Sequence, residues 1–366
     1  MTVEYIFAAI LLVYAVKILY FRIGAERASK PVEKEHSPFV SIIVAARDEE
    51  HNIGTCIEAL SRIEYPQDRM EIIIMNDQSE DRTADIIHEW EAKMPHLVYM
   101  ETEGKIYGLR GKANAVTQAI ERSKGEIILT SDADCQVQPG WVRDTIRQYS
   151  DDVGCVCGYT LIKPEGAFSI MQFLDWTYLM TVGAAGVGWN NPLSAVGNNM
   201  SFRRTAYEDV GGYREVGFSV TEDFVLFKAI GLKSQWKVRY PADPKTVVWS
   251  EPLRSIKEIY SQKKRWGKGG LEISVYGYAI MAAGFLTNVA IIASPFLGIN
   301  MLWWGVGLAV RMALDTWFLS YMLRKIGMLS KLVYLPLFEI YFHIYVTLLP
   351  FIATMTGKVT WKGRKF

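Results

Sequence analysis

The sequence predicts an α/β domain with a mostly parallel sheet, flanked on both sides by transmembrane helices. In the middle of the chain, short apolar β-branched runs alternate with segments of helical spacing, as in βαβ units. Long apolar runs occupy both ends of the chain. Acidic clusters directly follow two of the predicted strands, at the position where ligands of parallel sheets bind.

The composition argues against a nucleic-acid-binding protein. Lys plus Arg number 40 and Asp plus Glu number 39, so the chain carries no bulk positive charge. Half of the residues are hydrophobic and 13% are aromatic, which is rich for a soluble enzyme. The four cysteines form no CxxC pair and have no histidine at zinc-finger spacing, so we expect reduced thiols without a function.

The N-terminal apolar run, from Tyr5 to Phe21, is interrupted only by Lys17 and is long enough to span a bilayer. It lacks the basic start and the cleavage site of a signal peptide, so residues 1–22 are interpreted as a retained anchor. Basic residues follow this run but do not precede it: Arg22, Arg27, Lys30 and Lys34. The positive-inside rule therefore places the domain that follows in the cytoplasm, and together with the apolar runs at the C-terminal end this predicts a multi-pass protein of the cell (inner) membrane.

Residues 38–252 are predicted to form the α/β domain. Apolar runs predict strands at 39–46, 70–75, 98–102 and 126–130, and helical spacing predicts helices at 51–61, 83–91 and 113–122. Cys155 and Cys157 flank Val156 in a further strand and would share one sheet face. The segment 168–189 is either an interfacial helix facing lipid or an amphipathic helix packed on the sheet.

Residues 253–270 are predicted to be an interfacial segment, and residues 271–366 a C-terminal transmembrane region. Three spans are expected there, near Val275–Leu297, Asn300–Leu323 and Leu332–Met355. Within them, Arg311 and Asp315 lie one helical turn apart, as do Glu339 and His343. Each of these is either a structural polar pair or a contact to a lipid head group.

The topology of the last apolar segment is left open by the sequence. Three spans after a cytoplasmic domain would place the basic C-terminal residues outside, against the charge rule: Lys358, Lys362, Arg364 and Lys365. Alternatively, Pro336 and Pro350 would let the segment re-enter the membrane instead of crossing it.

Several polar clusters follow predicted strands. The clusters 46–50 and 76–81 carry carboxylates and amides that can bind the hydroxyls of a nucleotide, although acidic loops are often only solvated. Asp132 and Asp134 follow a buried strand, and such a pair can hold Mg²⁺ or Mn²⁺ together with substrate phosphates. A cation there would neutralise a departing diphosphate, but a DxD string also arises by chance.

Three further motifs have a functional and a structural interpretation. Thr221-Glu222-Asp223 opens a helix, where a carboxylate is either a cap or a catalytic base. Gln262-Lys263-Lys264-Arg265-Trp266 either marks a membrane boundary or offers Arg265 to a diphosphate and Trp266 to a sugar. Lys112 begins a helix that could meet a phosphate or be an ordinary helix start.

These motifs occur in a fixed order between the membrane segments: Asp77, Asp132-x-Asp134, Thr221-Glu222-Asp223 and Gln262-x-x-Arg265-Trp266. From Val40 to Trp266 the chain closely resembles the inverting family-2 glycosyltransferases of the membrane branch. That group includes the cellulose, chitin and hyaluronan synthases and the ceramide glucosyltransferases. The resemblance implies a nucleotide-diphospho-sugar transferase fold of the GT-A type, with a Rossmann-like domain.

The resemblance also implies a donor site for a nucleotide-diphosphate sugar, expected to be a UDP-sugar. Glu49 and Asp77 would bind the base and ribose of the nucleotide. Lys112, Asp132 and Glu222 would also meet the donor. The sequence departs from the family at Asn76-Asp77, where Asp-Asp is frequent, and at 45–48, where Ala-Ala-Arg-Asp replaces Pro-x-x-Asn; the second departure weakens any role for Asp48.

By the same resemblance, Asp132 and Asp134 would hold Mg²⁺ or Mn²⁺, and Asp223 would be the catalytic base. Three residues would close over the diphosphate and the acceptor: Gln262, Arg265 and Trp266. A single in-line displacement would invert the anomeric centre.

The acceptor is expected to be a membrane lipid, which would make the product a glycolipid, because the few spans leave little material for a polysaccharide channel. A processive synthase of a β-linked polysaccharide is the alternative. A third hypothesis is a catalytically silent protein that only binds sugar nucleotide, which the full set of acidic groups argues against.

Overall fold

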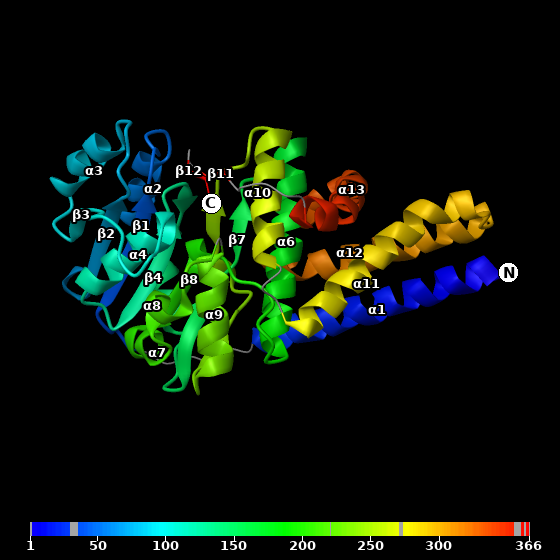
Figure 1. Cartoon of the computed structure of the whole chain (residues 1–366), viewed down its shortest axis with the longest axis horizontal. Coiled ribbons are helices and arrows are strands. Elements are labelled where there is room, and N and C mark those ends of the chain that lie inside the picture. The colour runs from blue at the N-terminus through cyan, green and yellow to red at the C-terminus, as the bar shows by residue number, and fades with distance from the viewer. Residues whose placement is uncertain are drawn as a thin grey trace.

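The computed structural model describes residues 2–29, 36–219, 221–270, 274–354, 360–361 and 364–365. An α/β domain lies at one end of the molecule and long helices extend from its side (Figure 1). The main sheet has seven strands in the order β3-β2-β1-β4-β8-β6-β9. Its strands are β1 (Val40–Ala46), β2 (Met70–Asn76), β3 (Leu97–Glu101), β4 (Ile127–Asp132), β6 (Val153–Cys157), β8 (Met200–Arg203) and β9 (Lys237–Arg239).

The first four strands of the main sheet form its parallel half. β1 pairs in parallel with both β2 and β4, and β2 pairs in parallel with β3. Their connections contain α2 (Ile53–Leu60), α3 (Thr83–Glu91) and α4 (Gly111–Arg122). β1 and β4 are buried along nearly their whole length, as strands covered on both faces must be. The predicted strands and helices of this half are confirmed.

The second half of the sheet contains antiparallel pairs. β8 pairs antiparallel with β4 and with β6, so the chain direction reverses in the middle of the sheet. A second sheet has the order β5-β10-β7, formed by β5 (Cys135–Gln136), β7 (Thr160–Ile162) and β10 (Val248–Ser250). The short helices α5 (Trp141–Ile146), α7 (Arg204–Asp209) and α8 (Gly212–Val216) complete this half with α9 (Glu222–Lys233). The strand next to β4 in the sheet is therefore β8, which lies about 70 residues later in the sequence.

Helix α6 (Ala167–Gly188) lies between the sheet and the long helices. Almost all of its residues are buried, and Phe173 is fully enclosed. Its end packs closely on α1, since a Cβ atom on Gly188 would lie 1.8 Å from the carbonyl oxygen of Gly24. The interpretation of 168–189 as a helix facing lipid is therefore wrong, because protein covers both of its sides.

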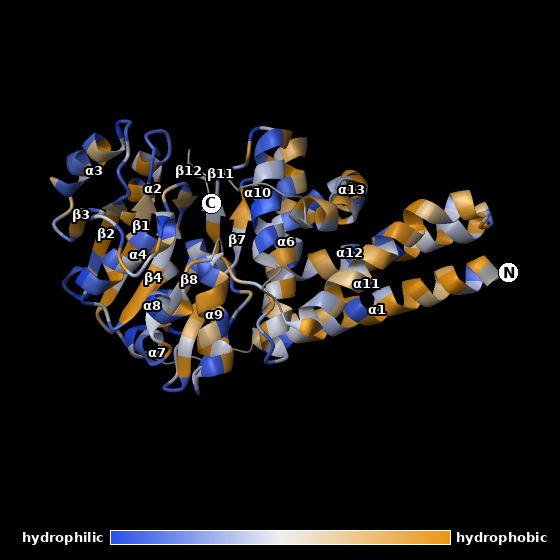
Figure 2. Cartoon of the chain, viewed as in Figure 1, coloured by the Kyte–Doolittle hydropathy of each residue, from blue (hydrophilic) through white to orange (hydrophobic). Residues whose placement is uncertain are grey.

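Four helices are long and apolar enough to cross a membrane, at Val3–Ala28, Val275–Leu297, Met301–Lys325 and Leu329–Ile352. They overlap the helices α1 (Thr2–Ala28), α11 (Val275–Ala293), α12 (Met301–Lys325) and α13 (Leu335–Thr354). Figure 2 shows that hydrophobic residues predominate along these helices, whereas the outer helices and loops of the α/β domain carry many hydrophilic residues. The four predicted apolar segments are confirmed as helical over their described residues, and Met355, the predicted end of the last segment, lies outside the described residues.

Helix α13 is oriented differently from the other three. α1, α11 and α12 run along the long axis of the molecule, whereas α13 is foreshortened and lies next to α10 (Ile256–Gly269) and α6 (Figure 1). One face of α13 is exposed and apolar: Leu337, Ile340, Ile344, Leu348 and Phe351. The short pair β11 (Thr360–Trp361) and β12 (Arg364–Lys365) lies at the α/β domain, and the N-terminal end of α1 lies at the opposite end of the molecule.

The ionisable residues predicted inside the bundle form one buried cluster. Arg311 Nε lies 3.5 Å from Asp315 Oδ2 and 3.4 Å from Glu339 Oε2. His343 Nδ1 lies 3.4 Å from Glu339 Oε2, and Tyr14 of α1 donates a hydrogen bond to Asp315. All these side chains are buried, so the structure supports the structural polar pair over the contact to a lipid head group.

Candidate active site

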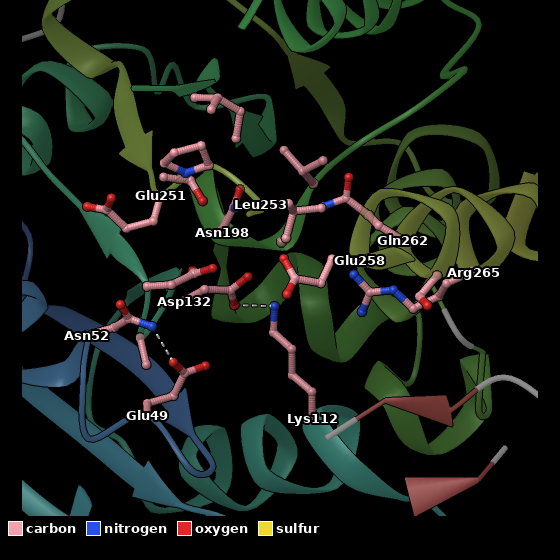
Figure 3. Close-up of a pocket in the computed structure, with 18 of the residues that line it drawn as sticks. Glu49, Asn52, Lys112, Asp132, Asn198, Glu251, Leu253, Glu258, Gln262 and Arg265 are labelled. Atoms are coloured by element: carbon pink, nitrogen blue, oxygen red, sulfur yellow. Dashed lines mark hydrogen bonds and ion pairs between the residues drawn. The ribbon is translucent and has the colours of Figure 1, made fainter. Parts of the chain in front are cut away.

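A cavity of about 810 Å³ opens at the carboxyl ends of β1 and β4. The loop after β1, the start of α4 and the segment after β4 form one wall, and the start of α9, α6 and α10 form the other (Figure 3). Of the predicted site residues, nine line this cavity: Glu49, Lys112, Asp132, Asp134, Glu222, Asp223, Gln262, Arg265 and Trp266. Motifs separated by more than 200 residues in the sequence therefore share one site.

Asp77 is the predicted site residue that does not line the cavity. Its side chain is 4% exposed, and its Oδ1 accepts a hydrogen bond from the Thr102 hydroxyl at 3.3 Å. Asp77 follows β2, which is one strand further from the cavity than β1, and its carboxylate contacts the residue that follows β3. The structure thus separates it from the other donor-binding candidates.

Glu49 is held in place by contacts between the loops that follow β1 and β2. Its backbone N–H donates to Thr83 Oγ1 at 2.8 Å, and the backbone N–H of Glu50 donates to Asp81 at 3.0 Å. The Glu49 carboxylate accepts a hydrogen bond from Asn52 Nδ2 at 2.8 Å (Figure 3). The loop after β2 and the start of α3 thus fix the loop after β1. Glu49 itself lies in neither a helix nor a strand, so these contacts hold it at the cavity wall.

Asp132 and Asp134 lie at the floor of the cavity, at and just beyond the end of β4. Burial, together with the negative charges of Asp132 and Glu49, raises the pKa of Asp134 to about 6. Such mutual repulsion is relieved by a cation, and carboxylate oxygens suit a hard divalent ion. Among the described residues no group of three or more metal-ligating side chains is present.

Lys112 projects from the start of α4 toward the same carboxylates. Its Nζ lies 2.5 Å from Asp132 Oδ1, which Figure 3 shows as a dashed line. Burial alone would lower the pKa of Lys112, but the carboxylates of Asp132, Glu222 and Asp223 outweigh it and raise that pKa. Lys112 is therefore a permanent positive charge at the centre of the cavity, suited to an anionic ligand.

Asp223 is fixed by two backbone N–H groups. Its Oδ2 accepts from Gly197 N–H at 2.5 Å and its Oδ1 accepts from Phe224 N–H at 2.8 Å. A Cβ atom on residue 197 would lie 3.0 Å from the Asp223 Cβ, so a glycine there lets the backbone approach the carboxylate. Asp223 lines the cavity in one defined orientation, as a catalytic base requires.

Glu222 is the neighbouring carboxylate. Burial and the nearby charge of Asp223 raise the pKa of Glu222 to about 7, although Lys112 opposes the shift. Glu222 holds a proton over much of the range below neutrality.

We expect Glu222 to make the stability of the protein depend on pH. Because its folded pKa of about 7 lies above the usual 4.5, the folded state binds more protons than the unfolded state between these values. The free energy of unfolding therefore falls as the pH rises through this window. Glu222→Gln should flatten this part of the melting-temperature profile by a few degrees, measured between pH 5 and 8 in detergent.

The matched control for this change is Glu89→Gln, at an exposed position of α3. It should leave the profile of the unmodified protein unchanged. An unaltered profile in Glu222→Gln would show that Glu222 does not titrate in this range.

Helix α10 supplies the remaining predicted residues. It begins at a capping serine, because Ser255 Oγ accepts a hydrogen bond from Glu258 N–H at 3.2 Å. Gln262 and Arg265 project toward the cavity (Figure 3), and Trp266 packs edge-on against Trp176 of α6, with ring centroids 5.2 Å apart. One face of α10 therefore lines the cavity, and another face packs on α6.

The structure adds cavity residues that the sequence analysis did not identify. Glu251 lies on the cavity wall and pairs with Lys163, with Nζ and Oε1 2.5 Å apart. Glu258 lies on the cavity-facing side of α10 and Asn198 lies next to Gly197. The Ser255-x-x-Glu258 spacing is a capping-box pattern that could have placed the start of α10, but it gives no sign of a ligand.

Comparisons with known proteins agree with this site. Over 246 residues the chain is 28% identical to a beta-monoglucosyldiacylglycerol synthase of Trichormus variabilis, covering 64% of this chain and 49% of that protein. Over 252 residues it is 26% identical to a poly-beta-1,6-N-acetyl-D-glucosamine synthase of Staphylococcus epidermidis, covering 66% and 57%. The chain spans about half the length of the curated relatives that it matches.

The fold is similar to that of a mannosyltransferase from Pyrobaculum calidifontis, solved with GDP-mannose and Mn²⁺. The TM-score is 0.62 at 18% identity, and the match covers 93% of this chain and 99% of that one. This likeness confirms the predicted GT-A type of fold. The sequence model of glycosyl transferase family 21 matches residues 3–366. The predicted resemblance to the glycosyltransferases is thus confirmed, and the chain belongs to glycosyl transferase family 21.

Proposed function

We propose that the protein transfers a sugar from a nucleotide-diphosphate donor to a hydroxyl group of a membrane lipid, with inversion. The observation that carries this proposal is the composition of one cavity. Strand-end carboxylates and Lys112 line one side, and the Arg265–Trp266 pair of α10 lines the other. α10 and α6 in turn contact the apolar helix α13, so the cavity lies directly beside the helices suited to a membrane.

The donor fits the cavity with its diphosphate between two positive groups. Lys112 on one wall and Arg265 on the other provide the charge, and the planar guanidinium can bind two phosphate oxygens at once. Glu49 would accept hydrogen bonds from ribose or base, as carboxylates at strand ends do. Asp77 does not line the cavity, so it would support the nucleotide site only indirectly, through the residues that do. A UDP-sugar is the donor that we expect.

Asp132 and Asp134 would hold a Mg²⁺ or Mn²⁺ ion, which would supply positive charge to the leaving diphosphate. The two carboxylates and their mutual repulsion fit this role. The cation and Lys112 would then compete for Asp132, whose Oδ1 lies 2.5 Å from the lysine.

The transfer needs one base and one route for the leaving group. Asp223 takes the proton of the acceptor hydroxyl, whose oxygen forms a bond to the anomeric carbon from the face opposite the diphosphate. The bond between that carbon and the diphosphate oxygen breaks, and its electron pair leaves with the nucleotide diphosphate, next to Arg265. One displacement inverts the configuration, so an α-linked donor gives a β-linked product.

A lipid acceptor is favoured over a growing polysaccharide. The cavity lining includes apolar and aromatic side chains that suit a lipid: Trp176, Val196, Leu253 and Trp266. The relative from Trichormus is a synthase of a glucosyl lipid, whereas the relative from Staphylococcus makes a polysaccharide. Processive synthesis of a β-linked polysaccharide is therefore the second candidate.

Incubation of the purified protein with labelled sugar nucleotides and a membrane lipid extract tests the proposal. A labelled product that partitions into organic solvent is expected. A water-soluble labelled polymer would instead establish the second candidate. No transfer with any donor would refute both functions.

We also propose a topology with the α/β domain in the cytoplasm. α1 would cross toward the cytoplasm, α11 and α12 would cross out and back, and α13 would stay on the cytoplasmic side of the bilayer. This topology keeps the basic residues after α13 inside, as the charge rule requires. It is supported by the different direction of α13 and by the position of β11 and β12 at the α/β domain (Figure 1).

Reporter proteins fused at three positions of the chain test this topology. Reporters placed after Lys34 and after Lys365 should both score as cytoplasmic, because an even number of crossings separates them. A reporter after Leu297, between α11 and α12, should score as external. If the reporter after Lys365 were external, α13 would be a full span.

A further inference from the structure

Helix α10 contains a lysine that none of the steps above uses. Lys263 lies between Gln262 and Arg265 in the sequence, yet it is 3% exposed and does not line the cavity. Its ammonium group pairs with the Asp175 carboxylate of α6, which is 1% exposed. A fully buried lysine on an otherwise hydrophilic helix therefore has a specific partner on the neighbouring element.

Side chains of α13 complete the surroundings of this pair. The hydroxyl of Tyr341 donates a hydrogen bond to Asp175 Oδ2 at 3.2 Å. Lys263 Nζ lies 4.3 Å from the ring centroid of Tyr345 and 4.7 Å from that of Trp266. Three helices, α6, α10 and α13, thus meet at a single charged contact that is closed from water.

Stability does not account for this arrangement. Burial lowers the pKa of Lys263, which shows the cost of keeping its charge there, and Asp175 only partly offsets that effect. Asp175 Oδ1 is buried and has no hydrogen-bond partner among the described residues. Replacing a buried ion pair by apolar side chains is often neutral or stabilising, and the best-attested use of such pairs is to fix register.

The register of α10 decides which side chains face the cavity. A helix turns by about 100° per residue, so a shift of one position would turn Arg265 away from the diphosphate. Ile259 and Lys263 are buried on one face of α10, whereas Glu258 and Arg265 line the cavity from another. An apolar contact has no preferred direction, so a helix held only by such contacts can slide or rotate. An ion pair with a single partner fixes the position of the helix.

We propose that the buried Lys263–Asp175 pair is a positioning site that sets the register of α10 over the cavity. It acts through Arg265 and touches neither donor nor acceptor. Asp175 immediately precedes Trp176, whose ring packs against Trp266, so the pair and the cavity wall are fixed together. This inference rests on the proposed function: its kinetic test needs the transfer reaction, and its binding test needs only the proposed contact between Arg265 and a diphosphate.

The test uses the double variant Lys263→Met/Asp175→Leu, which removes both buried charges and leaves none unpaired. We expect it to keep its melting temperature within a few degrees and to lose on the order of 10- to 10²-fold in kcat, as misplaced catalytic groups do. In a protein that already carries Arg265→Ala, the same double change should lower kcat by less than about twofold, because its effect passes through Arg265. An equal loss in both backgrounds, or wild-type kcat in the double variant, would overturn the proposal.

A binding measurement separates this inference from the proposed function. Arg265 contacts a diphosphate, so the full-length protein should bind UDP or GDP more tightly than UMP or GMP. The double variant should lose this preference to the same extent as Arg265→Ala, whether or not the transfer assay finds an acceptor. An unchanged preference for the diphosphate in the double variant would refute the positioning role. If the wild-type protein showed this preference but transferred no sugar, only the proposed function would be refuted.

Two further variants keep the result interpretable. Lys264→Met changes the adjacent lysine, which neither lines the cavity nor joins the pair, and it should leave kcat and the diphosphate preference unchanged. Tyr341→Phe removes one hydroxyl from the contact and serves where the double variant does not fold. It should reduce kcat a few-fold in the wild-type background and not in the Arg265→Ala background, and equal losses would again refute the proposal.

Discussion

Replacing Asp223 with Asn is expected to lower the transfer rate by on the order of 10²–10⁴-fold, the usual contribution of a general base. The amide has nearly the same size as the carboxylate and caps helices about as well. Its single amide oxygen can accept the hydrogen bond that Gly197 N–H donates to Asp223 at 2.5 Å, whereas the hydrogen bond from Phe224 N–H is lost. The amide cannot take a proton from the acceptor hydroxyl, so the loss should appear in kcat.

Donor affinity and the melting temperature should be measured on the same preparation, and both should stay close to wild type. Asp85→Asn is the matched control, since Asp85 is an exposed carboxylate in the first turn of α3 that does not line the cavity. Wild-type turnover by folded Asp223→Asn protein would mean that Asp223 only supports the helix. Glu222 would then be the next candidate, since burial and the charge of Asp223 raise its pKa to about 7 and so poise it near neutrality.

Removing divalent cations is expected to reduce transfer by about 10²-fold or more, because a bound cation contributes several kcal/mol at a developing anion. Added Mg²⁺ or Mn²⁺ should restore the rate. The carboxylates that carry this prediction are Asp132 and Asp134, where burial and like charge raise the pKa of Asp134 to about 6. The rate as a function of free metal concentration is the measurement.

Asp134→Asn should shift that curve to higher metal concentration, because one charged ligand is lost. Glu251→Gln is the matched comparison: Glu251 lies on the same cavity wall but pairs with Lys163, so its loss should not move the metal curve. Full transfer in excess chelator would remove the role given to the two aspartates.

The strands and helices of the parallel half could be predicted from the sequence because their signals are local. The β1, β2 and β4 strands are short apolar runs buried on both faces, and the predicted helix at 83–91 has the bounds of α3 in the structure. The site was predictable for a related reason. Strand ends in a parallel sheet meet at one edge, so Glu49, Asp132 and Asp134 had to lie near one another.

The remaining features depend on contacts between distant segments. The burial of α6 results from packing on α1, which no periodicity within 167–188 encodes. Asp77 follows a strand as Asp132 does, but its position one strand further out moves it behind the cavity wall. Glu251 becomes part of the site only because β10 pairs with β7, more than 80 residues earlier in the chain.

A continuous buried core joins the α/β domain to the bundle. It includes Ile43 of β1, Phe173 of α6, Phe21 of α1 and Phe318 of α12. Heat should therefore unfold the sheet and these helices in one cooperative transition, and a fragment cut at residues 38 and 252 would expose the bundle-facing side of α6 to water and aggregate. The membrane helices are thus part of the folding unit of the enzyme and not a detachable tether.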